Sequence, residues 1–180
     1  MRTCVELGAL MQVGAASVLA LARGSRRLLD GDLDPAGDAR VSLPVAAPPE
    51  RVWAVLADGA TYGDWVVAAN PVRAVDPEWP DVGASLAYSI GIRPLDLQGT
   101  TWVLHSDPPR LLELEIDLGT AGSVRVEIGL QAVGTGTRLS LDEHAERGPA
   151  RWMHNPAASA AYAARAVLML RRLRALAESP

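Results

Sequence analysis

Glu143 has the residue type and the position best suited to proton transfer in this sequence. It follows Leu139 and Leu141 at steps of two residues in a strand-like run, so strict alternation directs its carboxyl group to the apolar side of the strand. A carboxyl group placed there can take or give a proton in a reaction of a bound molecule. A bend or bulge near the end of the strand would instead leave Glu143 in solvent, and the sequence leaves both alternatives open. Glu143 is the one catalytic residue that we predict.

Aromatic and flexible apolar side chains are the candidates for ligand contact, because such side chains commonly line small-molecule sites. Tyr88 and His105 are in addition candidate partners of Glu143, if their strands direct them inward. The alternative for each candidate is ordinary core packing, since one Trp buries on the order of 200 Å2 and the chain has no Phe to fill its core. The predicted ligand-binding residues are Trp65, Tyr88, Trp102, His105, Tyr162 and Met169.

The spacings that mark metal, nucleotide and nucleophile sites do not occur in the sequence. The histidines come from separate segments and form neither an H-x-H nor an H-E-x-x-H pattern. The single Cys4 excludes an intrachain disulfide and a cysteine-based zinc site. Gly134-x-Gly136 joins two strand-like runs and does not open a helix, and no G-x-S-x-G motif is present. We therefore predict that the protein uses no metal and no other cofactor.

The charge balance limits the classes of partner. The net charge is −4 at pH 7, from 17 basic and 21 acidic residues, which favours neither a nucleic-acid groove nor binding to an anionic membrane. Near the C-terminus, positive charge would complement the negative end of a helix dipole, so the sequence predicts a solvated helix face there. The residues of this predicted face are Arg165, Arg171, Arg172 and Arg174.

The elements that must position these residues follow from the apolar pattern. A strand-like run at Val41 to Val45 precedes a short helical stretch, Pro49 to Ala57. Runs of period-two alternation then occupy Val72 to Ala145, which indicates an antiparallel sheet with one buried face. The only element long enough to cover that face is a helix at about Pro156 to Ala177. The predicted class is α+β. The apolar stripe of this helix contains Tyr162, Ala166, Met169, Leu173 and Leu176.

Residues 1–38 form an extension to this pattern. Leu7 to Ala22 is an uncharged run, shorter than the roughly 20 apolar residues that a membrane span needs. Its apolar residues recur at three- and four-residue steps and predict an extra N-terminal helix, followed by a linker at Asp30 to Asp38. A signal peptide ending near Ala20-Leu21-Ala22 is the alternative, although the positive charges lie on the wrong side of the run. The predicted location is cytoplasmic.

Several short motifs, taken in order, are similar to those of one family. They are Pro49 to Asp58, Tyr62 to Val66, Val75 to Pro80 with Gly83, Asp107 to Arg110, Gly136 to Arg138 and Gly148 to Ala150. Over about residues 39–178, this succession resembles the START-like (helix-grip) superfamily and, within it, the SRPBCC or polyketide cyclase/dehydrase and lipid-transport family. The resemblance implies a helix-grip fold, a curved antiparallel sheet wrapped around a long C-terminal helix, with a hydrophobic cavity between them. Residues 39–180 are thus the expected ligand-binding domain.

Three functions are consistent with these observations. Members of the family bind lipids, polyketides and other apolar ligands, which implies a small-molecule binding protein. Some members cyclise or dehydrate their ligands, so a cyclase, aromatase or dehydratase that uses Glu143 is the second hypothesis. A protein-interaction module that uses the groove or the N-terminal helix is the third.

Overall fold

The computed structural model of the protein describes residues 32–33, 40–90, 97–117, 122–147 and 156–180. In these residues, eight strands form one antiparallel sheet in the order β1-β2-β8-β7-β6-β5-β4-β3. The strands are β1 (Asp32–Leu33), β2 (Val41–Val45), β3 (Ala69–Val75), β4 (Ser85–Ile90), β5 (Leu97–Asp107), β6 (Leu111–Asp117), β7 (Ser123–Val133) and β8 (Gly136–Arg147).

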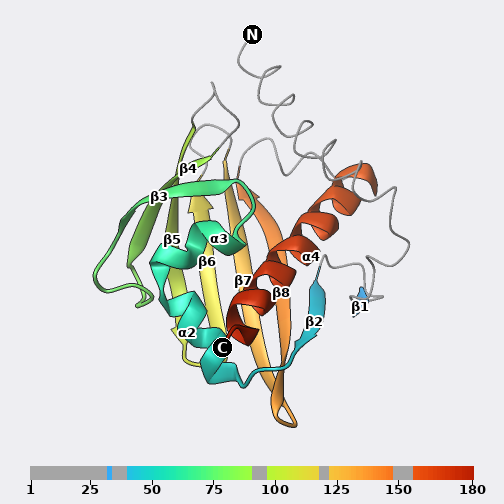
Figure 1. The fold of residues 1–180 in the computed structure, drawn as a ribbon. Coiled ribbons are helices and arrows are strands. Elements are labelled where there is room, and N and C mark those ends of the chain that lie inside the picture. The colour runs from blue at the N-terminus through green and yellow to red at the C-terminus, as the bar shows by residue number, and fades with distance from the viewer. Residues whose placement is uncertain (1–31, 34–39, 91–96, 118–121, 148–155) are drawn as a thin grey trace.

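All described helices lie on the same face of this sheet (Figure 1). The long helix α4 (Pro156–Glu178) crosses that face obliquely and contacts β2 and β8. Two short helices, α2 (Pro49–Ala57) and α3 (Tyr62–Trp65), pack against α4 and are joined by a 3-10 turn, η1 (Gly59–Thr61). The predicted α+β class, with a sheet wrapped around a long C-terminal helix, is confirmed.

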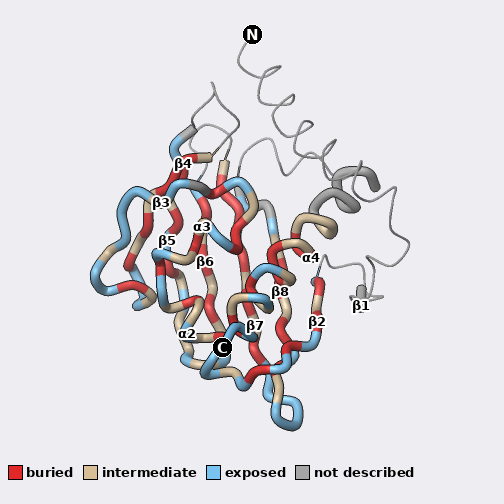
Figure 2. The backbone as a smooth tube through the Cα atoms, in the orientation of Figure 1, coloured by how far each residue is buried: buried red, intermediate tan, exposed pale blue. Residues whose placement is uncertain are grey.

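The sheet has one apolar face, as the alternation predicts. Rows of paired residues run across neighbouring strands, and one such row joins Leu112 of β6, Ile128 of β7 and Leu141 of β8. These three side chains are fully buried, whereas the residues before and after each of them in its own strand are more exposed. Figure 2 shows this pattern as buried positions that alternate with less buried ones along the strands beneath α4. The hydrophobic core therefore lies between this inner face and the helices.

Helix α4 presents a wide apolar face to the sheet. Ala166, Met169 and Leu173 of the predicted stripe are buried, and Leu176 is partly buried against them. Further buried positions in α4 are Val167, Leu170 and Ala177. The side chain of Tyr162 lies outside the described residues.

The C-terminal end of α4 is held by polar contacts with α2 and with the segment that links β2 to α2. The Ala46 N–H donates a hydrogen bond to the Glu178 carboxylate at 2.7 Å. The Arg51 guanidinium donates to the backbone carbonyl of Ser179. Together with the packing of α4 on α2, these bonds position the last turns of the helix over the sheet.

Most of the predicted N-terminal extension lies outside the described residues. Its two described residues, Asp32 and Leu33, pair with Ser42 and Val41 at the edge of the sheet. In the described part of the chain, no helix has both the length and the apolarity that crossing a membrane requires.

Gly99 of β5 should be sensitive to substitution, because it lies opposite Tyr88 in the β4–β5 pair. A Cβ atom at Gly99 would come within 2.8 Å of Tyr88 Cζ and 2.6 Å of Ile90 Cδ1, so the Tyr88 ring would have to move. We expect Gly99→Ala to lower the free energy of unfolding by about 1–3 kcal/mol, as overpacked sites do. Denaturant unfolding measures the change.

The matched control for this substitution is Gly129→Ala in β7. A Cβ atom there meets only the Ser140 hydroxyl, at 2.7 Å, which can rotate away. We expect Gly129→Ala to change the free energy of unfolding by less than about 1 kcal/mol. Equal losses in the two variants would contradict the proposed contact between Gly99 and Tyr88.

Candidate functional site beneath helix α4

Glu143 points to the inner face of the sheet. In β8 it continues the buried alternation of Leu139 and Leu141, and it pairs with the buried Val126 of β7. Its side chain is only 3% exposed. Of the two alternatives that the sequence leaves open, strict alternation therefore holds, and the alternative in which a bend exposes Glu143 to solvent is wrong.

The charge of Glu143 is balanced by Arg165 of α4. The Arg165 Nη1 atom donates a hydrogen bond to Glu143 Oε1 at 2.5 Å, and the Arg165 side chain is 28% exposed. Burial tends to lower the pKa of Arg165, but the charge and the hydrogen bond of Glu143 outweigh it and raise that pKa above its ordinary value. Arg165 thus stays cationic. The prediction that it belongs to a solvated helix face is wrong, because it pairs with an inward carboxylate, whereas Arg172 is exposed.

One oxygen of Glu143 has no hydrogen-bond partner among the described residues. Arg165 holds Oε1, whereas Oε2 is buried and accepts no hydrogen bond from that part of the chain. Buried polar atoms are nearly always paired, because an unpaired one loses its hydrogen bonds to water without replacement. The inner face beneath α4 therefore contains an acceptor with unused hydrogen-bonding capacity.

A chain of three hydroxyl groups lies on the same inner side of the fold. The hydroxyls of Tyr62 in α3 and Thr101 in β5 are 2.9 Å apart, and Thr101 Oγ1 donates to the Tyr88 hydroxyl of β4 at 3.5 Å. All three residues are buried. The chain connects α3 with two neighbouring strands of the sheet.

Both phenols in this chain remain neutral at physiological pH. Burial raises the pKa of Tyr62 well above its usual value, and Tyr88 raises it further, against the opposing effects of the Thr101 hydrogen bond and the Arg165 charge. Burial likewise raises the pKa of Tyr88, although its hydrogen bonds with Thr101 and Tyr62 and the Arg165 charge act in the opposite direction. Neutral phenols keep their protons and can donate hydrogen bonds. The influence of Arg165 on both phenols links the hydroxyl chain electrostatically to the ion pair.

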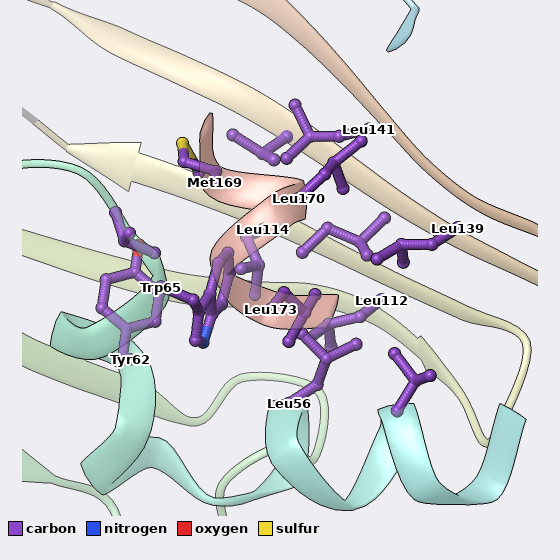
Figure 3. Close-up of a cluster of buried hydrophobic side chains, with 14 of the residues drawn as sticks. Leu56, Tyr62, Trp65, Leu112, Leu114, Leu139, Leu141, Met169, Leu170 and Leu173 are labelled. Atoms are coloured by element: carbon purple, nitrogen blue, oxygen red, sulfur yellow. The ribbon is translucent and has the colours of Figure 1, made fainter. Parts of the chain in front are cut away.

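Aromatic rings enclose the hydroxyl chain on the side of α3. The Tyr62 ring packs edge-on against Trp65 at 5.2 Å and Trp79 at 6.3 Å between centroids, and it lies tilted against Tyr88 at 5.3 Å. The Trp79 Nε1–H donates to the Leu56 carbonyl at 3.0 Å, which ties its ring to α2. Figure 3 shows Trp65 of α3 between Tyr62 on one side and Leu173 of α4 and Leu114 of the sheet on the other.

The ion pair and the hydroxyl chain lie at opposite sides of an apolar strip. Glu143 belongs to the row that continues through Val126 and Leu114, and Thr101 belongs to the adjacent row that begins at Ile116. The two polar residues are three strands apart in the sheet, which corresponds to roughly 14 Å across the strands at the usual strand spacing. The side chains that cover the interval are all buried and apolar.

The structure brings together some of the predicted ligand-binding residues. Trp65, Tyr88 and Met169 are buried on the inner side. Trp102 is 45% exposed and alternates with the inward residues of β5, and His105 is exposed opposite Glu113 on the outer face. The structure thus does not join Trp102 and His105 to Glu143. Tyr162 lies among the side chains that are not described.

Three residues of this site were missed by reasoning from the sequence: Tyr62, Thr101 and Arg165. A signal for Arg165 exists, since it precedes Met169 by four residues and therefore lies on the same side of the helix. Tyr62 precedes Trp65 by three residues, which gives the same signal in α3. Thr101 carries no such signal, because its inward orientation depends on the register of β5 with β6. In the described residues, no group of three His, Cys, Asp or Glu side chains could hold a metal ion.

Comparison with known proteins identifies relatives of the chain. A family model described as polyketide cyclase / dehydrase and lipid transport matches residues 37–178. No curated protein matches the chain.

Solved structures with the same fold come from several bacteria. A Rhodobacter sphaeroides protein is 26% identical, with a TM-score of 0.58 over 81% of this chain and 97% of its own. An Arthrobacter aurescens protein is 16% identical, with a TM-score of 0.61 over 85% and 93% of the two chains. The Zhui aromatase/cyclase of Streptomyces sp. R1128 is 18% identical, with a TM-score of 0.59 over 77% and 92%. At these identities the resemblance concerns the fold.

The buried phenols predict a loss of stability at alkaline pH. In the unfolded chain tyrosines ionise near pH 10, whereas in the folded protein Tyr62 and Tyr88 ionise at higher pH. The two groups therefore leave the free energy of unfolding unchanged below about pH 10 and lower it as the pH rises further. Phenolate absorbance should show at least two of the three tyrosines ionising late, and Tyr62→Phe or Tyr88→Phe should each remove one of the late ionisations. Ionisation of all three near pH 10 in a chain with native circular dichroism would contradict the burial.

Proposed function

We propose that this chain, which belongs to the polyketide cyclase/dehydrase and lipid-transport family, binds an apolar small molecule between its sheet and α4. The observation that carries the proposal is the half-satisfied carboxylate of Glu143, whose Oε2 atom is buried without a partner in the described part of the chain. A buried ion pair adds little stability compared with an apolar pair of the same size. A polar group retained in this position is therefore better explained by a ligand than by folding.

The composition of α4 supports the same location. The described side chains next to Arg165 include Ala163, Ala164 and Ala166, whereas from residue 168 onward the helix carries Leu and Met. Small side chains fill less of the space between a helix and a sheet than large ones do. The three alanines lie in the turn of α4 that contains Arg165, so we propose that the ligand lies beside the ion pair.

The surroundings of the proposed site suit an apolar molecule with few polar groups. Trp65 and Met169 supply aromatic and flexible apolar surface, and the hydroxyl chain with the Glu143–Arg165 pair supplies the polar contacts. Ligand sites in proteins typically combine a largely apolar lining with a small number of placed polar groups.

Binding can be tested with Nile red, a neutral apolar dye, and with the molecules that co-purify with the protein in native mass spectrometry. We expect saturable binding of one dye molecule per chain. Met169→Trp should weaken dye binding by about tenfold or more, equivalent to about 1.4 kcal/mol. Met169 is a buried residue of α4, and the larger Trp ring would take up the space that the ligand needs.

The control for this substitution is Trp102→Ala, at a position 45% exposed on the outer face. This variant should bind Nile red as the unaltered chain does. Equal weakening by both substitutions, or dye binding that never saturates, would contradict a site between the sheet and α4.

Glu143 favours a second candidate function, a cyclase or dehydratase acting on the bound molecule. An inward carboxylate beside a guanidinium is suited to proton transfer at a ligand, and the family description includes both cyclases and dehydrases. For a substrate identified among the co-purifying molecules, Glu143→Gln should then lower kcat by about 100-fold or more.

Glu146→Gln supplies the matched control for catalysis. Glu146 lies in the same strand, but its side chain is 42% exposed and pairs with Arg125 on the outer face. We expect kcat to be unchanged in this variant. Turnover that survives undiminished in Glu143→Gln would exclude Glu143 as the group that transfers the proton.

A further inference from the structure

We propose that the ligand of this chain is a neutral molecule that donates a hydrogen bond, from a phenol or an alcohol, to Glu143 Oε2. This inference rests on the proposed binding function and specifies the chemical class of its ligand. The structure holds an acceptor, Oε2, that is buried on the inner face and accepts no hydrogen bond from the described residues. The other oxygen is already held by Arg165 at 2.5 Å.

The chemistry of the carboxylate selects a donor. An ionised carboxylate has only acceptor oxygens, so the group that completes its hydrogen bonding must carry a proton. A hydrogen bond to a charged acceptor is stronger than one between neutral groups, particularly away from water. A carboxylate ligand, such as a fatty acid, would instead place a second negative charge against Oε2 at a site where the Arg165 charge is already paired with Glu143.

The hydroxyl chain complements this contact. Tyr62, Thr101 and Tyr88 are joined by hydrogen bonds among their hydroxyl groups, which can both donate and accept. Because the phenols stay neutral, a hydroxyl that gives up a bond within the chain can donate to an acceptor such as a ketone or a quinone carbonyl. Between the two polar positions lie Val126, Leu114 and Ile116, which are apolar and buried. A ligand that spans them has a hydroxyl at one end, an apolar body and a carbonyl at the other end.

Three naphthalene probes of similar shape test the donor requirement with the full-length protein. They are β-naphthol, which donates a hydrogen bond, β-naphthyl methyl ether, which cannot, and β-naphthoate, which is an anion. Isothermal titration calorimetry should give β-naphthol an affinity about tenfold or more above that of the ether, the usual effect of a hydrogen bond to a charged group. β-Naphthoate should bind most weakly.

Glu143→Gln should reverse the selectivity. Arg165 is a donor and will hold the amide oxygen of Gln, which leaves the amide NH2 at the place of Oε2. The site then offers a donor, so β-naphthol should lose its advantage and methyl β-naphthyl ketone should gain affinity. Glu146→Gln, which makes the same change on the outer face of β8, should keep the selectivity of the unaltered chain.

The outcomes separate the inference from the proposed function. Equal affinities for β-naphthol and its methyl ether would overturn the inference and leave apolar binding intact, as would tighter binding of β-naphthoate. Failure of the unaltered chain to bind any of the probes would overturn both. The comparison among probes uses the unaltered chain, so it decides the question even where Glu143→Gln does not fold.

Discussion

The rest of the structure depends on covering one apolar face of an antiparallel sheet. Each strand from β2 to β8 contributes inward residues, and a face of this size exposed to water would be unfavourable in proportion to its area. Helix α4 covers the face with the buried side chains of Leu170 and Leu173. The short helices complete the cover, since α2 contacts β7 and α3 contacts β3 (Figure 1). Because one long helix provides most of the cover, its side chains also decide what the space above the sheet contains.

Ion pairs on the inner and outer faces of the sheet differ in their exposure to water. On the outer face, Arg125 pairs with Glu113 at 2.7 Å and with Glu146 at 3.0 Å, and Arg40 pairs with Glu127 at 2.9 Å. Such exposed pairs contribute little to stability, and either partner can exchange its contact for water. The Glu143 carboxylate cannot exchange its contact with Arg165 for water in this way, because its side chain is almost fully buried. The Glu143 carboxylate thus differs from these exposed pairs by its burial on the inner face.

The two polar positions of the interior belong to different parts of the fold. Glu143 lies in β8 and pairs with Arg165 of α4, whereas the hydroxyl chain joins α3 to β4 and β5. An apolar strip of the central strands separates them, and Arg165 influences the phenols across that interval. This arrangement matches an elongated molecule with polar ends better than a compact or uniformly apolar one. It also gives a carboxylate that could exchange a proton with the ligand, so binding and catalysis would use the same group.

The sequence by itself determined the elements of this protein, and the tertiary structure decided its site. The predicted bounds of β2 and α2 agree with the structure, and α4 extends only one residue beyond its prediction, because alternation and helical periodicity are local properties of the backbone. The inward direction of Glu143 followed from that alternation, but its partner did not. Arg165 lies 22 residues away in the sequence, and Tyr62 and Thr101 are separated by 39. Whether such groups meet depends on the register of β5 and on the rotation of α4 over the sheet, which only packing between distant elements decides.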